Sequence, residues 1–175
     1  MLLFQKAEIS DASAVAQLVN SAYRGEISRK GWTTEADLLE GLRTTRQELA
    51  EIIKREDAFM LIGIINNEIV ATICCEWQAI ADNNTAHFGM IAVKPTLQNK
   101  GYGKQIIQAA EALTRREWRV VGFTMTVISL RHELITFYEK LGYQRTGEFK
   151  EFPKKPELWQ PKVESLNLQY LAKLV

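Results

Sequence analysis

The stretch LQNKGYGKQII, residues 97–107, constrains the fold of this chain more than any other part of the sequence. Gly101 and Gly103 stand at the start of an apolar helical pattern, directly after a segment with the composition of a strand. A strand that runs through a glycine turn into a helix presents the unpaired N–H groups and the positive dipole end of that helix. Glycine lets the backbone approach a phosphate closely. The pattern therefore predicts an anion site at the helix start, with Lys100 and Lys104 adding charge at its rim.

Two familiar phosphate-binding loops do not fit this turn. A Walker A loop requires Ser or Thr after its lysine, and Gln105 follows Lys104 here. A dinucleotide fingerprint requires a third glycine at position 106, which is Ile106. For an isolated pair of glycines, a tight strand–helix turn without a ligand is the competing interpretation.

The periodicity of the whole chain predicts a mixed α/β (α+β) arrangement around one sheet, in a single domain of residues 1–175. No repeat or linker divides it. We expect strands at 2–9, 58–65, 68–77, 86–93, 120–128, 143–149 and 163–174, and helices from Ser10 or Asp11, at 33–42, at 45–54, at 103–116 and at 134–141. Asn66 and Asn67 are typical of a hairpin turn.

Composition excludes several classes of function. Lys and Arg number 22 against 21 Asp and Glu, so a nucleic-acid partner is not expected. The N-terminus does not resemble a signal peptide, no apolar run is long enough for a bilayer, and we expect a cytoplasmic protein with no membrane partner. The adjacent Cys74 and Cys75 point to opposite faces of a strand, which disfavours a disulfide. No metal-binding spacing is present, so we expect no metal.

Two separated motifs resemble the GCN5-related N-acetyltransferases, the GNAT superfamily. The family signature Q/R-x-x-G-x-G/A corresponds here to Gln98, Asn99, Lys100, Gly101, Tyr102 and Gly103. Residues 135–148, ITFYEKLGYQRTGE, resemble the family's F-Y-x-x-x-G-[FY] helix–strand element. The flanking elements also match, so the resemblance covers nearly the whole chain. It implies an acyl-CoA N-acyltransferase fold, with a mostly antiparallel sheet of six to seven strands that splays in the middle, flanked by about four helices.

The resemblance also implies acetyl-CoA as co-substrate. The pyrophosphate would lie in the glycine turn beside Lys104, and the pantetheine arm would pair with free backbone groups of Ile91, Ala92 and Val93. One position departs from the family pattern, because Arg131 stands where many members have an Asn that touches the cofactor. Arg131 either pairs with a cofactor phosphate or caps its helix through its own backbone.

By the same resemblance, Tyr138 occupies the position of the general acid that protonates the departing thiolate. The alternative is that Tyr138 is a core aromatic. The base that removes the amine proton is less determined, and Glu76 and His87 are the candidates. The alternatives are that Glu76 is a solvated residue at the end of a strand and that His87 is a hydrogen-bonded surface or core imidazole.

The acceptor is expected to be a primary amine of an unidentified small molecule or peptide, attacked directly in a ternary complex. Arg24 and Arg29 are candidates for holding a carboxylate, with Trp32 as an apolar wall and Trp77 as a further substrate contact. A second candidate loop carries Phe152 and Trp159; for both loops, solvated loop structure and ordinary tryptophan packing are the alternatives. A non-catalytic acyl-CoA-binding sensor or scaffold is the alternative function. The sequence also allows a homodimer.

Overall fold

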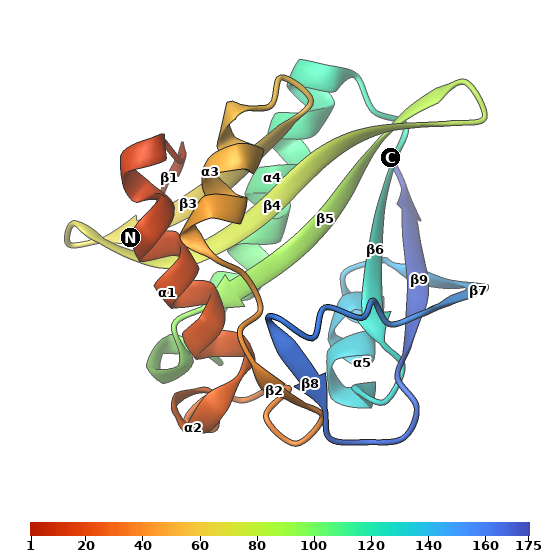
Figure 1. Cartoon of the computed structure of the whole chain (residues 1–175). Helices are drawn as coiled ribbons and strands as arrows, with labels where there is room; N and C mark the ends of the chain where they lie inside the picture. Colours follow the sequence, from red (N-terminus) through yellow and green to blue (C-terminus); the bar gives the residue numbers. More distant parts are fainter.

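The computed structural model describes all 175 residues and contains a seven-stranded sheet with helices on both faces (Figure 1). The sheet order is β1-β3-β4-β5-β6-β9-β7, and only the β5–β6 pair is parallel. The strands are β1 (Leu3–Lys6), β2 (Leu39–Gly41), β3 (Ala58–Ile65), β4 (Glu68–Ile80), β5 (Asn83–Val93), β6 (Gly122–Ile128), β7 (Gln144–Glu151), β8 (Trp159–Pro161) and β9 (Asn167–Leu174). The helices are α1 (Ala12–Tyr23), α2 (Gly25–Ser28), α3 (Arg46–Lys54), α4 (Tyr102–Trp118) and α5 (His132–Lys140), with 3₁₀ turns at Ile9–Asp11 and Pro95–Leu97. The predicted fold class is confirmed.

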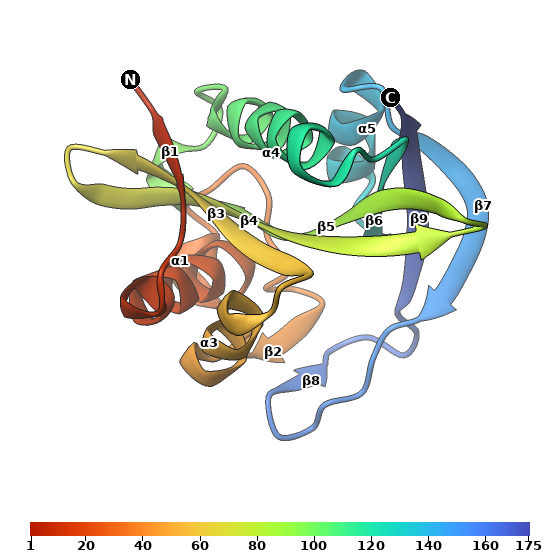
Figure 2. The same ribbon diagram turned by 90° about the horizontal axis from the view of Figure 1, so that it is seen from above.

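Each face of the sheet buries its own hydrophobic core. Helices α4 and α5 cover one face, and α1 and α3 cover the other (Figure 2). Cys74 and Cys75 divide between these two cores, as their alternation on β4 predicted, and both are free thiols. No helix combines the length and apolar composition that spanning a bilayer requires.

The sheet opens between β5 and β6. The two strands pair only from Thr85–Gly122 to Phe88–Met125, and beyond that point they separate (Figure 1). The register of β4 against β5 also shifts there, and Met90 adopts a positive φ of 46°. A bulge at this position turns the end of β5 away from β6. The separation leaves the last residues of β5 with a free edge that faces α5.

Local sequence signals place several elements correctly. Asn66 and Asn67 both have positive φ in the β3–β4 hairpin, as expected for a two-residue turn of this type. Thr45 caps α3 by accepting a hydrogen bond from the Glu48 N–H at 3.1 Å. Gly142 has a φ of 98° just after α5, where a left-handed residue ends a helix.

The predicted helix at 33–42 is wrong. The segment forms a turn followed by β2, which pairs with β8 as a separate two-stranded sheet. Leu39 is buried with Trp159 in a small cluster at the C-terminal end of β6, and Glu35 is buried in an ion pair with Arg131. These tertiary contacts, made with residues far along the chain, outweigh the local helical pattern.

Candidate active site

The start of α4 is an uncapped helix terminus. Gly101 occupies the N-cap position with a φ of 84°, and no side chain there bonds to the first turn. The first helical bond of this terminus runs from the Gln105 N–H to the Gly101 carbonyl at 3.1 Å. The N–H groups of Tyr102, Gly103 and Lys104 therefore point out of the helix without an intrahelical partner. These free N–H groups lie at the turn where the sequence predicts an anion site.

A first cavity, of about 150 Å³, lies against this terminus. Its walls come from the end of β5, the glycine turn, α5 and the loop after α2. Among the predicted cofactor residues, it is lined by Ile91, Ala92, Val93, Gln98, Asn99, Gly101, Gly103, Lys104 and Arg131. Lys100 is exposed outside this cavity, and Tyr102 packs against the core under α4.

The edge of β5 beside this cavity carries free backbone groups. The Lys94 N–H donates to the Val70 carbonyl at 2.8 Å, across the pair with β4. Successive residues of a strand point their N–H groups in opposite directions, so the Val93 N–H points toward the gap instead. The Val93 carbonyl on that side accepts from Gln98 Nε2 at 3.2 Å. The Val93 N–H is thus available to a polyamide chain or a developing oxyanion.

Gln98 links the glycine turn to the loop after α2. Its Oε1 accepts from the Trp32 N–H at 2.7 Å and from the Thr33 N–H at 3.3 Å. Gly31 leaves space for this, since a Cβ at that position would lie 2.5 Å from Gln98 Oε1. Trp32 consequently packs edge-on against Phe137, at 5.7 Å between ring centroids, in the wall of the first cavity.

A second cavity, of about 240 Å³, lies on the other side of the gap in the sheet. It extends along β5 and the end of β6, and the segment from β7 to β8 closes its far side. The residues that line both cavities are Tyr23, Ile91, Arg131, Leu134 and Tyr138. The two cavities therefore meet at the separation of β5 from β6.

Tyr138 lies at this junction. It is 4% exposed, and its hydroxyl makes no hydrogen bond within the protein. Burial raises its pKa well above 10, with a smaller contribution from Tyr23, so the phenol stays protonated at neutral pH. Tyr23, at the end of α1, is a junction residue that the sequence reasoning missed. An aromatic residue before a loop has no distinctive local signal.

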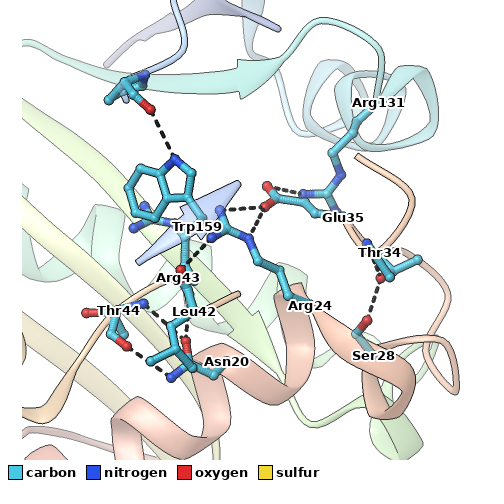
Figure 3. A network of polar contacts seen from close by, with 12 residues as sticks. Asn20, Arg24, Ser28, Thr34, Glu35, Leu42, Arg43, Thr44, Arg131 and Trp159 are labelled. Atoms are coloured by element: carbon cyan, nitrogen blue, oxygen red, sulfur yellow. Dashed lines mark hydrogen bonds and ion pairs between the residues drawn. The ribbon is translucent and has the colours of Figure 1, made fainter. Parts of the chain in front are cut away.

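Arg131 uses its backbone and its side chain for different purposes. Its carbonyl accepts from the Leu134 and Ile135 N–H groups, both at 3.1 Å, at the start of α5. Arg131 is 6% exposed, and its guanidinium pairs with Glu35 at 3.1 Å and donates to Thr33 Oγ1 at 2.7 Å. Figure 3 shows Glu35 between Arg131 and Arg24, whose Nη2 is 3.1 Å from the same carboxylate. The helix-start role is present in the structure, and the side chain bridges distant loops.

Comparison with known proteins identifies this arrangement. A model of the acetyltransferase (GNAT) family matches residues 16–143. The chain belongs to the GNAT family. No curated protein matches the sequence at a significant level.

Solved acetyltransferases share the whole architecture of this GNAT chain. A GNAT acetyltransferase from Streptococcus pneumoniae is similar with a TM-score of 0.69 and 16% identity over 100% of this chain and 99% of its own. The ribosomal-protein-S18-alanine N-acetyltransferase of Escherichia coli has the same TM-score and identity, over 100% and 94%. A Bacillus anthracis acetyltransferase, solved with acetyl coenzyme A, reaches 0.67 and 18% over the full length of both chains. At these identities the likeness establishes the fold.

The two base candidates of this GNAT domain face each other across strands. Glu76 of β4 is opposite His87 of β5, and both line the second cavity. Glu76 pairs with Arg55 at 2.7 Å, and His87 Nδ1 shares a hydrogen bond with Thr124 Oγ1 at 2.9 Å. His87 precedes Ile91 by four residues, about 13 Å along an extended strand. Neither group therefore lies at the junction of the two cavities.

Three predicted substrate contacts lie elsewhere. Arg24 is 4% exposed, lines neither cavity, and stacks on Trp159 with its Cζ 5.0 Å from the ring centroid. Arg29 forms surface ion pairs with Glu26 and Asp37. Trp77 is outside both cavities. The second candidate loop does reach the site, since Phe152 and Trp159 line the second cavity.

Proposed function

We propose that this protein transfers the acetyl group of acetyl-CoA to a primary amine of a small molecule or peptide, by direct attack in a ternary complex. Membership of the GNAT family supports acetyl transfer. The uncapped start of α4, with Lys104 beside it, suits a diphosphate. The free edge of β5 suits the amide groups of the pantetheine arm. A separate cavity is left for the acceptor, and a metal is not needed for this chemistry.

The proposed reaction joins an amine from the second cavity to a thioester from the first. The neutral amine attacks the thioester carbon, a C–N bond forms, and the Val93 N–H stabilises the oxyanion. The C–S bond then breaks, and the thiolate takes a proton from the Tyr138 hydroxyl. The amine's surplus proton leaves through water in the second cavity, with His87 or Glu76 as acceptor, and the phenol is reprotonated from solvent.

The position of Tyr138 carries this proposal. The Tyr138 hydroxyl makes no hydrogen bond within the protein, and the residue lines both cavities at the point where they meet. The hydroxyl is not one of the fully buried polar atoms without a partner, so it is accessible from the cavities. Burial raises the pKa of this phenol, so it carries its proton at neutral pH. A protein that only binds acyl-CoA has no need for a donor there.

The test is a steady-state comparison of wild type with Tyr138→Phe, which removes one hydroxyl and keeps the ring. We expect kcat to fall by about 10²–10³, the range for loss of a positioned general acid, with little change in KM for acetyl-CoA. Tyr170→Phe on β9 is the matched control, because Tyr170 lines neither cavity and should leave kcat unchanged. Thermal melts of both variants check the fold.

Two results would count against the proposal. Wild-type kcat in Tyr138→Phe would remove the general-acid role. If wild type bound acetyl-CoA but released no CoA with any amine of a broad library, the sensor or scaffold alternative would replace catalysis.

A further inference from the structure

The second cavity has an unbalanced charge. Its acidic residues are Glu35 and Glu76, and both are already held in ion pairs. Its basic residues include Arg43, Lys150 and Lys155, and none of these three is in an ion pair with an acidic side chain of the protein. The walls therefore present three cations without counter-charges to whatever occupies the cavity.

Of these three cations, Arg43 is the one that stacks on a residue of the junction. Its Cζ lies 5.6 Å from the centroid of the Tyr23 ring, and Tyr23 lines the junction of the two cavities. The Arg43 side chain makes no hydrogen bond within the protein, although it is only partly exposed. A guanidinium held by ring stacking alone keeps its donors free for a planar, two-oxygen partner such as a carboxylate.

A second basic group is buried at the same junction. Arg24 and Arg131 share the carboxylate of Glu35, and the Arg131 Nε lies 3.9 Å from Oε1 of the more exposed Glu133. The buried Nε of Arg131 has no hydrogen-bond partner, and Arg131 lines both cavities. A buried donor without a hydrogen bond carries a desolvation cost.

The outer cations extend this pattern. Lys150 on β7 and Lys155 in the β7–β8 connection stand on the wall formed by the C-terminal segment. They lie over aromatic rings, with the Lys150 Nζ 5.8 Å from the Tyr170 centroid and the Lys155 Nζ 5.6 Å from that of Trp159. Their charges repel a cationic group that enters the cavity.

We propose that the acceptor is a free α-amino acid, with its carboxylate bound by Arg43 and its amine at the junction beside Tyr138. This inference rests on the proposed function and specifies its substrate class. The small volume of the cavity and the closeness of Arg43 to the junction favour an amine and a carboxylate only a few bonds apart. Lys150 and Lys155 disfavour basic side chains. The same positive surroundings also favour the neutral form of the amine, which is the form that attacks.

The test compares CoA release from acetyl-CoA with free amino acids, with their carboxamides, and with phosphoethanolamine. We expect kcat/KM to be about 10- to 100-fold higher for amino acids than for the matched carboxamides, the effect of one or two charge-assisted hydrogen bonds. Lysine and arginine should be the poorest amino acids of the set. Arg43→Gln should remove the preference by lowering kcat/KM for the acids alone.

The control is Arg46→Gln, which removes the same charge three residues away. Arg46 is exposed on α3 and lines neither cavity, so this variant should keep the wild-type preference. Equal rates for acids and carboxamides, or an equal loss for both in Arg43→Gln, would overturn the inference. So would a clear preference for phosphoethanolamine or for peptides over every free amino acid.

A binding measurement separates this inference from the proposed catalysis. If no amine is acetylated, calorimetry of N-acetyl amino acids and their carboxamides, in the presence of CoA, still measures the preference for a carboxylate. Tighter binding of the acids, lost in Arg43→Gln and kept in Arg46→Gln, would support an amino-acid site in a protein that is not an acetyltransferase. No binding of either compound would overturn the site itself.

Discussion

At the scale of single residues, His87 shows how the fold controls protonation near the site. Burial lowers the pKa of its imidazole below 6.5, Glu76 opposes this effect, and Lys150 adds to it. The imidazole is therefore neutral at pH 7, so it can accept a proton that arrives through water. The hydrogen bond to Thr124 Oγ1 orients the ring.

The lowered pKa of His87 has a measurable effect on stability. As pH falls below 6.5, the unfolded chain takes up the proton before the folded protein does, so folding loses free energy until the folded pKa is passed. The free energy of unfolding, measured by urea denaturation between pH 7.5 and 5, should fall less steeply in His87→Gln than in wild type. Identical slopes would show that burial of this imidazole does not affect its titration.

Glu35 illustrates why residue roles were only partly predictable. The glycine turn and Tyr138 were placed by motifs, since their spacing along the chain determines their geometry. Glu35 instead joins Arg24 and Arg131, and its partnership with Arg131 spans ninety-six positions. No local pattern marks such a pair, and for the same reason Arg24 was expected at a substrate rather than in a buried ion pair.

At the scale of elements, the start of α4 combines strain and charge in one turn. Gly101 needs a φ that other residues adopt at a cost, while the space around it is open, because a Cβ at this position would meet only Gln105 Nε2, at 3.9 Å. A side chain there would project in front of the free N–H groups. The turn thus depends on glycine for conformation and for access.

Gly101→Glu should abolish the rise in melting temperature that acetyl-CoA causes, because a carboxylate would occupy the anion site. In wild type that rise should be roughly 5–10 °C at about 100 times the dissociation constant. Gly147→Glu on β7 is the matched control, since Gly147 has the same φ of 84°, open space around it, and no place in either cavity. If Gly101→Glu kept the full shift, the turn would not bind the cofactor.

Elements with strong local signals were predicted well, and those defined by distant partners were not. The β3–β4 hairpin follows from Asn66 and Asn67, and α4 follows from its apolar face of Ile106, Ile107 and Ala110. In contrast, β2 and β8 are three residues long and exist only through each other. The bulge at Met90 also has no sequence signature, because it arises from the register with β4.

At the scale of the whole molecule, a short parallel pairing of β5 with β6 joins the two halves of the sheet. Only four residue pairs connect β5 to β6 before the strands separate. Phe88 and Phe123 stack there, at 5.4 Å between ring centroids, and both are buried. The gap at the candidate active site is thus bordered by a packed aromatic contact.

Phe123→Ala should lower the free energy of unfolding by about 3–5 kcal/mol, the usual cost of removing a buried aromatic side chain. Phe149→Ala, at a side chain that is 57% exposed, should change it by less than about 0.5 kcal/mol. Urea denaturation of both variants provides the measurement. A small effect at Phe123 would mean that the pairing of β5 with β6 does not depend on the stacking of Phe88 and Phe123.

The overall topology was predictable because family motifs fix the order of the elements. The location of the gap was also expected from that resemblance. The shape and charge of the second cavity were not, since its walls combine residues from 23 to 168 that only the folded chain brings together.

The pairing of β2 with β8 also sets a rule for redesigning this enzyme. The segment that closes the second cavity is hydrogen-bonded at Trp159–Pro161 to Leu39–Gly41. A transplanted loop from another family member would replace one strand of this pair and leave the other without its hydrogen-bonding neighbour. New acceptor preferences should therefore be introduced by exchanging both segments together, as a single cassette, while the cofactor half of the molecule is left intact.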